Sequence, residues 1–216
     1  MVLDMAFCPT VIVLAAGRGS RFYGPLRAPR QLDDPDMLDA TLRQVVASEL
    51  PVLVVTTPRL EASARAHVAA RDVVVLPEVK RPDGGTAVPS LCDCIAAGVG
   101  TRPGASGWVV LPADMPLVQP GTLVAVAQAL RVHAVAYAQH AGRRGHPVGF
   151  AAELYSELVQ LPDDSGARRL VARYPSCGVD VDDPGTQLDL ESLQDLAQQA
   201  APPPGPRAWA PAPPAF

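Results

Sequence analysis

The sequence has little lysine and no run of basic residues. Lysine occurs once, at Lys80, so nearly every basic role falls to arginine, which can bind phosphate but does not serve as a proton-transfer base. Lys and Arg total 18 against 22 Asp and Glu, for a net charge of -4. A nucleic-acid surface would need a basic patch, so we do not expect a polymeric nucleic acid as a partner.

The sequence also lacks the patterns of a membrane span, a disulfide framework and a zinc knuckle. No apolar stretch approaches the roughly 20 residues that cross a bilayer, and the first residues carry an acid instead of a basic leader. We therefore expect a cytoplasmic protein. The spacing of the cysteines predicts reduced, mostly buried thiols. Cys92 and Cys94 lie on a predicted helix, where residues two apart face different directions and do not readily share a metal. The other two cysteines are Cys8 and Cys177.

The length of 216 residues suits one domain with a sizeable core, predicted over residues 1–200 and followed by a disordered Pro/Ala-rich tail at 201–216. Strands are predicted at 11–15, 51–56, 72–76, 108–112, 134–139, 147–150 and 178–181, and helices at 37–49, 60–70, 90–99, 121–131, 151–160, 166–174 and 191–199. Alternating strands and helices predict an α/β class, a Rossmann-like three-layer α/β/α fold. We expect its sheet to be mostly parallel, with a small antiparallel addition at residues 134–150.

Several residues are predicted to start or end these elements. Asp36 is placed to cap the helix over 37–49, and Asp164 to cap the helix that begins near Gly166. Gly98 and Gly100 are expected to end the helix that starts at Ser90. The three prolines between Tyr23 and Asp36 predict an irregular surface flap, and Arg81–Thr86 a loop.

The stretch Val11–Phe22, VIVLAAGRGSRF, joins a buried strand to a glycine-rich turn. Two glycines in the turn let backbone N–H groups approach an anion, and two arginines add positive charge, so the stretch predicts a phosphate cradle. A tight turn with two solvent-facing arginines is the alternative. Phe22 stands where the dinucleotide fingerprint needs a third glycine, and the Gly-Lys-Ser/Thr of the ATPase phosphate loop is absent, which disfavours an NAD-dependent oxidoreductase.

Acidic residues follow two of the predicted strands. Asp114 comes directly after the strand 108–112, at the sheet edge where the glycine turn also opens, and a carboxylate there could hold Mg²⁺ against phosphates. A turn-forming role is the alternative for Asp114. Either Asp189 or Glu191 could complete the metal shell, but both also suit the first turn of a helix.

Two further residues are candidates for substrate contact. His146 lies between glycine and proline at the start of a strand, where a backbone hydrogen bond in a turn would explain it nearly as well. Arg168 projects from the first turn of the helix that Asp164 is predicted to cap, and an ordinary N-cap accounts for Asp164.

These motifs occur together in the order found in one known family. They are Leu14–Arg21 (LAAGRGSR), Leu111–Pro116 (LPADMP), Gly145–Pro147 (GHP), Asp164–Arg168 (DSGAR) and Asp189–Ser192 (DLES). The sequence resembles the MobA-like NTP transferases and looks most like their molybdenum cofactor cytidylyltransferase branch. The resemblance spans about residues 10 to 199, and the combination is more specific than any single motif.

The resemblance implies a GT-A-like nucleotidyltransferase fold and an enzyme that transfers a nucleoside monophosphate from an NTP to a phosphate-bearing acceptor. It implies Mg²⁺ as cofactor, release of pyrophosphate, and a role in molybdenum cofactor biosynthesis. The implied partners are CTP or GTP, with CTP favoured, an acceptor such as molybdopterin, and a molybdoenzyme or its maturation factor.

Matching motifs carry the family's roles onto this chain. Arg21 and Asp114 would be catalytic, Asp114 and Glu191 would hold the metal, and His146 and Arg168 would meet the acceptor. The residues that would bind the nucleotide are Leu14, Ala15, Ala16, Gly17, Arg18, Gly19, Arg21, Arg30, Ser90 and Cys94.

The sequence departs from the family pattern at three places. Arg30 stands near the family's phosphate-binding lysine, and arginine keeps that charge. Ser90–Cys94 replaces a base-recognition segment of glycine and then serine, which leaves the base open, and Glu191 replaces an aspartate. Two other functions remain consistent with these residues: a nucleotide-binding accessory or regulatory protein without turnover, and a sugar-phosphate nucleotidyltransferase.

Overall fold

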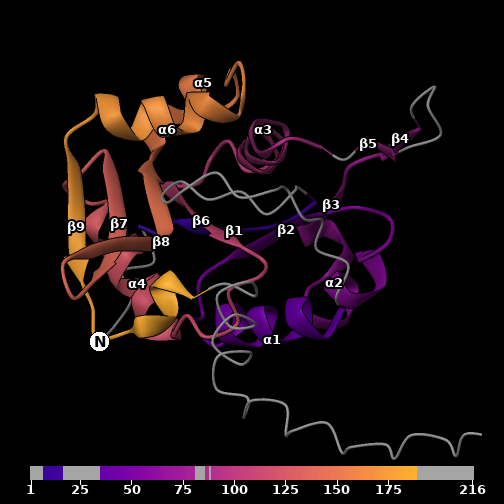
Figure 1. Cartoon of the computed structure of the whole chain (residues 1–216). Helices are drawn as coiled ribbons and strands as arrows, with labels where there is room; N and C mark the ends of the chain where they lie inside the picture. The colour runs from indigo at the N-terminus through magenta and orange to yellow at the C-terminus, as the bar shows by residue number, and fades with distance from the viewer. Residues whose placement is uncertain (1–6, 17–34, 81–85, 88, 189–216) are drawn as a thin grey trace, which may run out of the picture.

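The computed structural model describes residues 7–16, 35–80, 86–87 and 89–188, which form a mixed sheet between two layers of helices (Figure 1). The seven-stranded sheet has the order β3-β2-β1-β6-β8-β7-β9. β8 pairs antiparallel with β6 and β7, and the other neighbouring strands pair in parallel. The strands are β1 (Thr10–Ala15), β2 (Val52–Thr56), β3 (Val73–Val75), β6 (Gly107–Pro112), β7 (Val135–His140), β8 (Arg143–Ala151) and β9 (Ser176–Asp180).

The central strands are apolar on both faces because helices cover both. Successive side chains of a strand point to opposite faces, so Val11 and Val13 enter one hydrophobic core while Ile12 and Leu14 enter the other. All six residues of β1 and all six of β6 are buried. Near-continuous apolar strands of this kind are typical of a sheet covered on both sides, as the sequence predicts.

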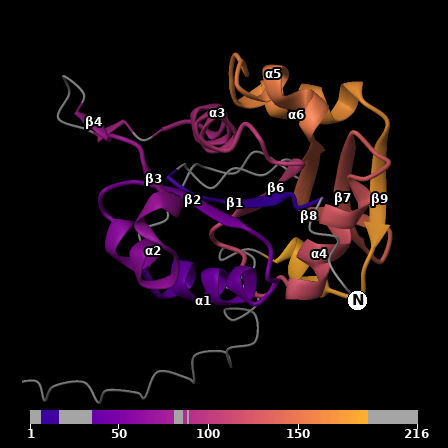
Figure 2. The same cartoon turned by 180° about the vertical axis from the view of Figure 1, so that it is seen from behind.

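Helices of the described residues pack on both faces of the sheet (Figures 1 and 2). One layer contains α1 (Pro35–Val46), α2 (Glu61–His67) and α4 (Pro120–Ala129), and the other contains α3 (Leu91–Thr101), α5 (Tyr155–Leu158) and α6 (Asp164–Arg173). The predicted three-layer α/β/α class, with its antiparallel addition, is therefore confirmed.

Short elements complete the described structure. The backbones of β4 (Val79–Lys80) and β5 (Thr86–Ala87) pair antiparallel in a separate ribbon, so Thr86 belongs to a strand and not to the predicted loop. The 3₁₀ helices are η1 (Ala70–Asp72), η2 (Ala152–Leu154) and η3 (Pro184–Gln187). The single helix predicted over 151–160 is wrong, because η2 and the one-turn α5 replace it.

Three predicted helix ends are also wrong. Asp36 lies inside the first turn of α1, because Pro35 fits the start of a helix, where no N–H partner is needed. The cap of α6 is Asp163, whose carboxylate accepts the backbone N–H groups of Ser165 and Gly166. α3 continues through Gly98 and Gly100 to Thr101.

Gly98 serves packing instead of ending the helix. A Cβ built on Gly98 would lie 2.7 Å from Cγ2 of the buried Ile12 and 3.2 Å from Cγ2 of Val55. The absence of a side chain therefore lets α3 approach β1 and β2 closely.

Two predictions about the chain as a whole can be compared with the described residues. None of the four cysteines is in a disulfide. Cys92 and Cys94 are buried as predicted, whereas Cys8 and Cys177 are only half-buried. Across the described ranges, no helix has the length and apolar character needed to cross a membrane. The segment 17–34, the helix predicted over 191–199 and the predicted tail 201–216 lie outside the described residues.

Candidate functional site

The carboxyl ends of β1 and β6 lie side by side at the point where the strand order changes direction. From β1 the chain first continues to β2 and β3 on one side of it and then returns to β6 on the other. Leu14 pairs with Pro112, and the Ala113 N–H donates to the Leu14 carbonyl over 3.1 Å. In open α/β sheets, ligands bind outside the carboxyl ends of the strands at such a switch point.

Asp114 lies at this edge, next to backbone that hydrogen bonds hold in place. The hydroxyl of Thr41, on α1, donates to the Ala113 carbonyl over 2.8 Å, and Thr41 has no exposed surface. Ala113 is therefore held by β1 through its N–H and by α1 through its C=O. The neighbours of Asp114 are buried, with Ala113 1% and Met115 3% exposed, while Asp114 is half-buried. The predicted position of Asp114 after a buried strand is observed.

The strand side of the predicted phosphate cradle lies next to Asp114. Leu14, Ala15 and Ala16 are buried, and Ala16 is the last described residue before the glycine turn. Gly17, Arg18, Gly19, Arg21 and Arg30 lie outside the described residues, as does Glu191. The roles assigned to those residues stay predictions.

His146 belongs to the same region of the sheet. β8 runs antiparallel to β6 with Val148 opposite Val110, so the start of β8 lies toward the carboxyl end of β6. His146 is 4% exposed and its bond to Pro147 is cis. His146 therefore lies toward the end of β6 that Asp114 follows, and its burial is also what a structurally held histidine would show.

The predicted base-recognition segment forms the start of α3. The Ser90 hydroxyl accepts the Asp93 N–H over 3.2 Å, and the Asp93 carboxylate accepts the Ser90 N–H over 3.0 Å and the Ser90 hydroxyl over 2.6 Å. This reciprocal capping box satisfies backbone donors that the first helical turn leaves without a partner. Cys94 has no exposed surface and packs in the core of this layer. In the structure, Ser90 therefore caps α3 and Cys94 packs in the hydrophobic core.

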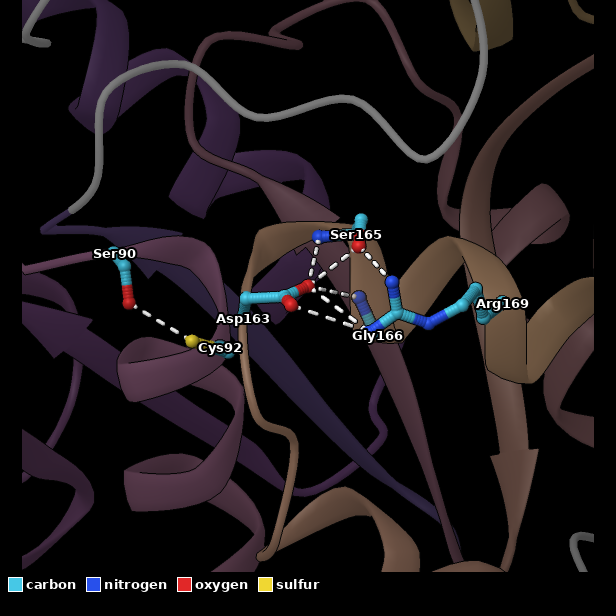
Figure 3. A network of polar contacts seen from close by, with 6 residues as sticks. All are labelled: Ser90, Cys92, Asp163, Ser165, Gly166 and Arg169. Carbon is cyan, nitrogen blue, oxygen red and sulfur yellow. Dashed lines mark hydrogen bonds and ion pairs between the residues drawn. The ribbon is translucent and has the colours of Figure 1, made fainter.

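The first turn of α6 carries a denser polar network (Figure 3). One oxygen of Asp163 accepts the Ser165 hydroxyl over 2.6 Å and the N–H groups of Ser165 and Gly166 over 2.9 Å each, and Arg169 pairs with the same carboxylate. The Ser165 hydroxyl and then the Arg169 guanidinium lower the pKa of Asp163 below its usual 3.8. α6 packs against α3, and Arg168 is half-buried on this helix.

The carboxylate at the strand ends suits a cation that a nucleotide would hold for the most part. Within the described residues, no group of three or more His, Cys, Asp or Glu side chains is placed to hold a metal ion. Asp114 supplies one carboxylate at the switch point. Protein Mg²⁺ sites commonly use one or two carboxylates together with substrate phosphates, so a single described acid fits this arrangement.

The fold, with its open edge at the switch point, is of the Rossmann-like α/β class, and solved structures share it. Rv0371c from Mycobacterium tuberculosis H37Rv superposes with a TM-score of 0.64 at 27% identity, covering 89% of this chain and 96% of that one. The same protein, solved with manganese, gives 0.64 at 26% identity, covering 89% and 97%.

More distant structures share the fold. A nucleotidyl transferase from Methanothermobacter thermautotrophicus gives a TM-score of 0.61 at 20% identity, covering 89% of this chain and 95% of that one. CMP:2-keto-3-deoxy-manno-octonic acid synthetase complexed with CTP gives 0.56 at 17% identity, covering 89% and 100%. A comparison with curated proteins found no match.

The family profile described as the MobA-like NTP transferase domain matches residues 11–177, and the chain belongs to this family. It is a nucleotidyltransferase enzyme of that group, as the resemblance implies.

Two residues that hold the site without joining it were not predicted from the sequence. Thr41 is an ordinary buried residue of an amphipathic helix, and nothing local links it to Ala113. Asp183 is the second such residue. Its place before Pro184 and Gly185 is a detectable signal, because Asp followed by Pro is typical of the start of a helical turn.

Proposed function

We propose that this protein transfers a nucleoside monophosphate from an NTP, with CTP favoured, to the phosphate of an acceptor such as molybdopterin, with Mg²⁺ as cofactor and release of pyrophosphate. One observation carries the proposal: Asp114 stands at the switch point of a MobA-like NTP transferase domain, on backbone held by both β1 and α1. Ala16, which leads into the glycine-rich turn, directly follows the neighbouring strand β1.

In this proposal Asp114 and Glu191 hold the metal, which offsets the negative charge of the triphosphate when it is bound. The backbone N–H groups around Gly17 and Gly19 bind the phosphates, and Arg21 and Arg30 add fixed positive charge. Leu14, Ala15 and Ala16 shape the strand side of the nucleotide site. Arg18, Ser90 and Cys94 stay in the proposal as nucleotide contacts.

The reaction needs no covalent enzyme intermediate. A terminal phosphate oxygen of the acceptor attacks the α-phosphorus of the NTP in line. The bond from the α-phosphorus to the bridging oxygen breaks, and pyrophosphate leaves with that electron pair. The phosphate nucleophile is already ionised near neutral pH, so the protein contributes by positioning the two reactants and by stabilising charge at the α-phosphate.

On the acceptor side, His146 and Arg168 are the proposed contacts, and a molybdoenzyme or its maturation factor would receive the product. A fold neighbour that is a CTP complex supports CTP as the donor. A sugar phosphate is the alternative acceptor, and both acceptor classes belong in the assay.

The test of the proposed activity is pyrophosphate release with Mg²⁺, NTP and acceptor, compared between the parent and Asp114→Asn. Removing a group that stabilises transition-state charge typically costs about 10²-fold or more in turnover, and we expect a loss of that size. Asp180→Asn is a matched control, because Asp180 is an exposed acid on β9 whose carboxylate accepts from Gln139 over 2.9 Å. Equal rates for Asp114→Asn and the parent would show that Asp114 does not hold the metal.

The base is tested without knowing the acceptor. A ligand that binds only the native state raises stability in proportion to RT ln(1 + [L]/Kd), so melting temperatures with CTP, GTP, ATP and UTP, each with and without Mg²⁺, rank the four nucleotides. We expect the largest Mg²⁺-dependent rise with CTP. A larger rise with GTP would contradict the cytidylyl assignment and leave the transfer chemistry in place.

A further inference from the structure

The short segment Asp183–Gln187, which contains η3, lies between the loop that follows Asp114 and the start of β8. Its first residue, Asp183, is only 2% exposed although it is an acid. One carboxylate oxygen of Asp183 accepts the Gly185 N–H over 2.9 Å and so caps η3. The other oxygen accepts the Gln119 N–H over 2.8 Å and the Thr122 hydroxyl over 2.6 Å, both at the start of α4.

Backbone contact joins η3 to the same loop. A Cβ built on Gly185 would lie 2.2 Å from the Leu117 carbonyl oxygen, a distance no side chain tolerates. Gly185 therefore presses directly on the segment between Asp114 and Gln119. Together with the Asp183 hydrogen bonds, this contact fixes the loop that leaves Asp114 at its far end.

The other side of η3 contacts the hairpin that leads to His146. A Cβ on Gly145 would lie 2.4 Å from the Thr186 carbonyl oxygen. The side-chain amide of Gln187 donates to the carbonyls of His140 over 2.8 Å and Arg143 over 3.2 Å. One short segment thus touches both the Asp114 loop and the strand that carries His146.

We infer that Asp183 is a positioning residue that holds Asp114 in place for binding the metal and nucleotide, an inference that rests on the proposed function. Thr41 and Leu14 fix the backbone before Asp114, and Asp183 fixes the backbone after it. The carboxylate of Asp114 is then presented from a loop tied at both ends. Groups that orient a metal ligand in this way typically change metal affinity or activity by about 10–100-fold when they are replaced.

The bonding pattern explains why this position needs a carboxylate. Each oxygen of Asp183 faces donors only, and an ionised carboxylate accepts at both oxygens. In Asp183→Asn, one of these oxygens becomes an NH₂ group that faces an N–H or a hydroxyl donor. The substitution keeps the size of the side chain but breaks either the cap of η3 or the link to α4.

The experiment measures Mn²⁺ affinity of the whole chain with each of CTP, GTP, ATP and UTP, by calorimetry. The expected result is a Kd for Mn²⁺ about 10–100-fold weaker in Asp183→Asn, a smaller change in Thr122→Val, and a parent-like Kd in Thr122→Ser, which keeps the hydroxyl. Phe150→Leu is the stability control. Phe150 is fully buried and pairs with Trp108 near the amino end of β6, so its replacement lowers the melting temperature without changing the Kd.

Amide hydrogen exchange over residues 115–119 gives a second reading that does not depend on metal. We expect faster exchange at Gln119 in Asp183→Asn than in Phe150→Leu. A folded Asp183→Asn protein with the parent's Kd for Mn²⁺ and unchanged exchange would overturn the role of Asp183 alone. A parent protein that binds no Mn²⁺ with any of the four nucleotides would contradict the proposed function and the metal part of this inference together.

Discussion

Replacing Thr41 by valine tests whether helix α1 fixes the backbone that carries Asp114. The Thr41 hydroxyl donates to the Ala113 carbonyl over 2.8 Å, and both residues are buried. Valine has nearly the same shape but no hydroxyl, so the variant removes this hydrogen bond with little change in packing. The carbonyl that remains lies in the interior, directly before Asp114.

The magnitude follows from the burial of that carbonyl. Leaving a buried acceptor without a partner costs about 1–3 kcal/mol in the free energy of unfolding. In a protein of this size, each kcal/mol corresponds to roughly 2–4 °C in melting temperature. Movement of a catalytic group by about 1 Å can cost about 10²-fold in rate, so we expect pyrophosphate release to fall further than the stability loss explains.

The assay pairs Thr41→Val with Thr101→Val, its matched control. The Thr101 hydroxyl also donates to a helix carbonyl, that of Ala97, over 2.8 Å, but at an exposed position. Water replaces the lost donor there, so the free energy of unfolding should change by less than about 0.5 kcal/mol and the rate should stay at the parent level. Equal stability losses in the two variants would refute the claim that α1 fixes the backbone at Ala113.

Two further predictions concern helices on the opposite face of the sheet. Gly98→Ala places a methyl group against Ile12, whereas the methyl group of Gly100→Ala in the same helix meets no atom within 4 Å. In urea unfolding, Gly98→Ala should therefore be less stable than Gly100→Ala by about 1–3 kcal/mol. Equal stabilities would contradict the close approach of α3 to β1. Asp163→Ala removes the cap of α6. Because the folded pKa of Asp163 is lowered, its contribution to stability is present above the unfolded pKa of about 3.9 and is lost as the pH falls through the lower folded pKa. The melting temperatures of the parent and Asp163→Ala should therefore differ at neutral pH and converge in acid. Asp163→Asn should keep much of the cap. A difference between the parent and Asp163→Ala that does not depend on pH would contradict the role of the charge.

The layers of the fold follow from local patterns in the sequence. Runs such as Val11–Ala15 and Trp108–Pro112 are apolar at every position, which predicts strands covered on both faces. The strand-to-turn junctions at Ala16 and Asp114 then place the candidate site at one edge of a parallel sheet. These inferences need only neighbours along the chain, and the structure confirms the strands and the layers.

What holds the site together depends on contacts between distant parts of the chain. Thr41 meets Ala113 and Asp183 meets Gln119 only after folding. No local pattern marks Thr41, and the Asp-Pro pattern at Asp183 predicts a helical turn but not its hydrogen bond to Gln119. The same reason accounts for Gly98, where a glycine that suggests a helix end is explained by the side chain of Ile12 across the layer boundary. The cap of α6 is Asp163 and not the predicted Asp164, because two adjacent acids suit the cap equally well in the sequence.

The most direct test of the proposed function is mass spectrometry of the reaction product. The protein is incubated with CTP, Mg²⁺ and molybdopterin, and the Asp114→Asn protein is treated in parallel. We expect an acceptor joined to CMP through a diphosphate linkage, together with pyrophosphate, in the parent reaction and a strong reduction of both in Asp114→Asn. Nucleotide-linked product at equal levels in the two reactions, or no such product from any NTP with either a molybdopterin or a sugar-phosphate acceptor, would contradict it.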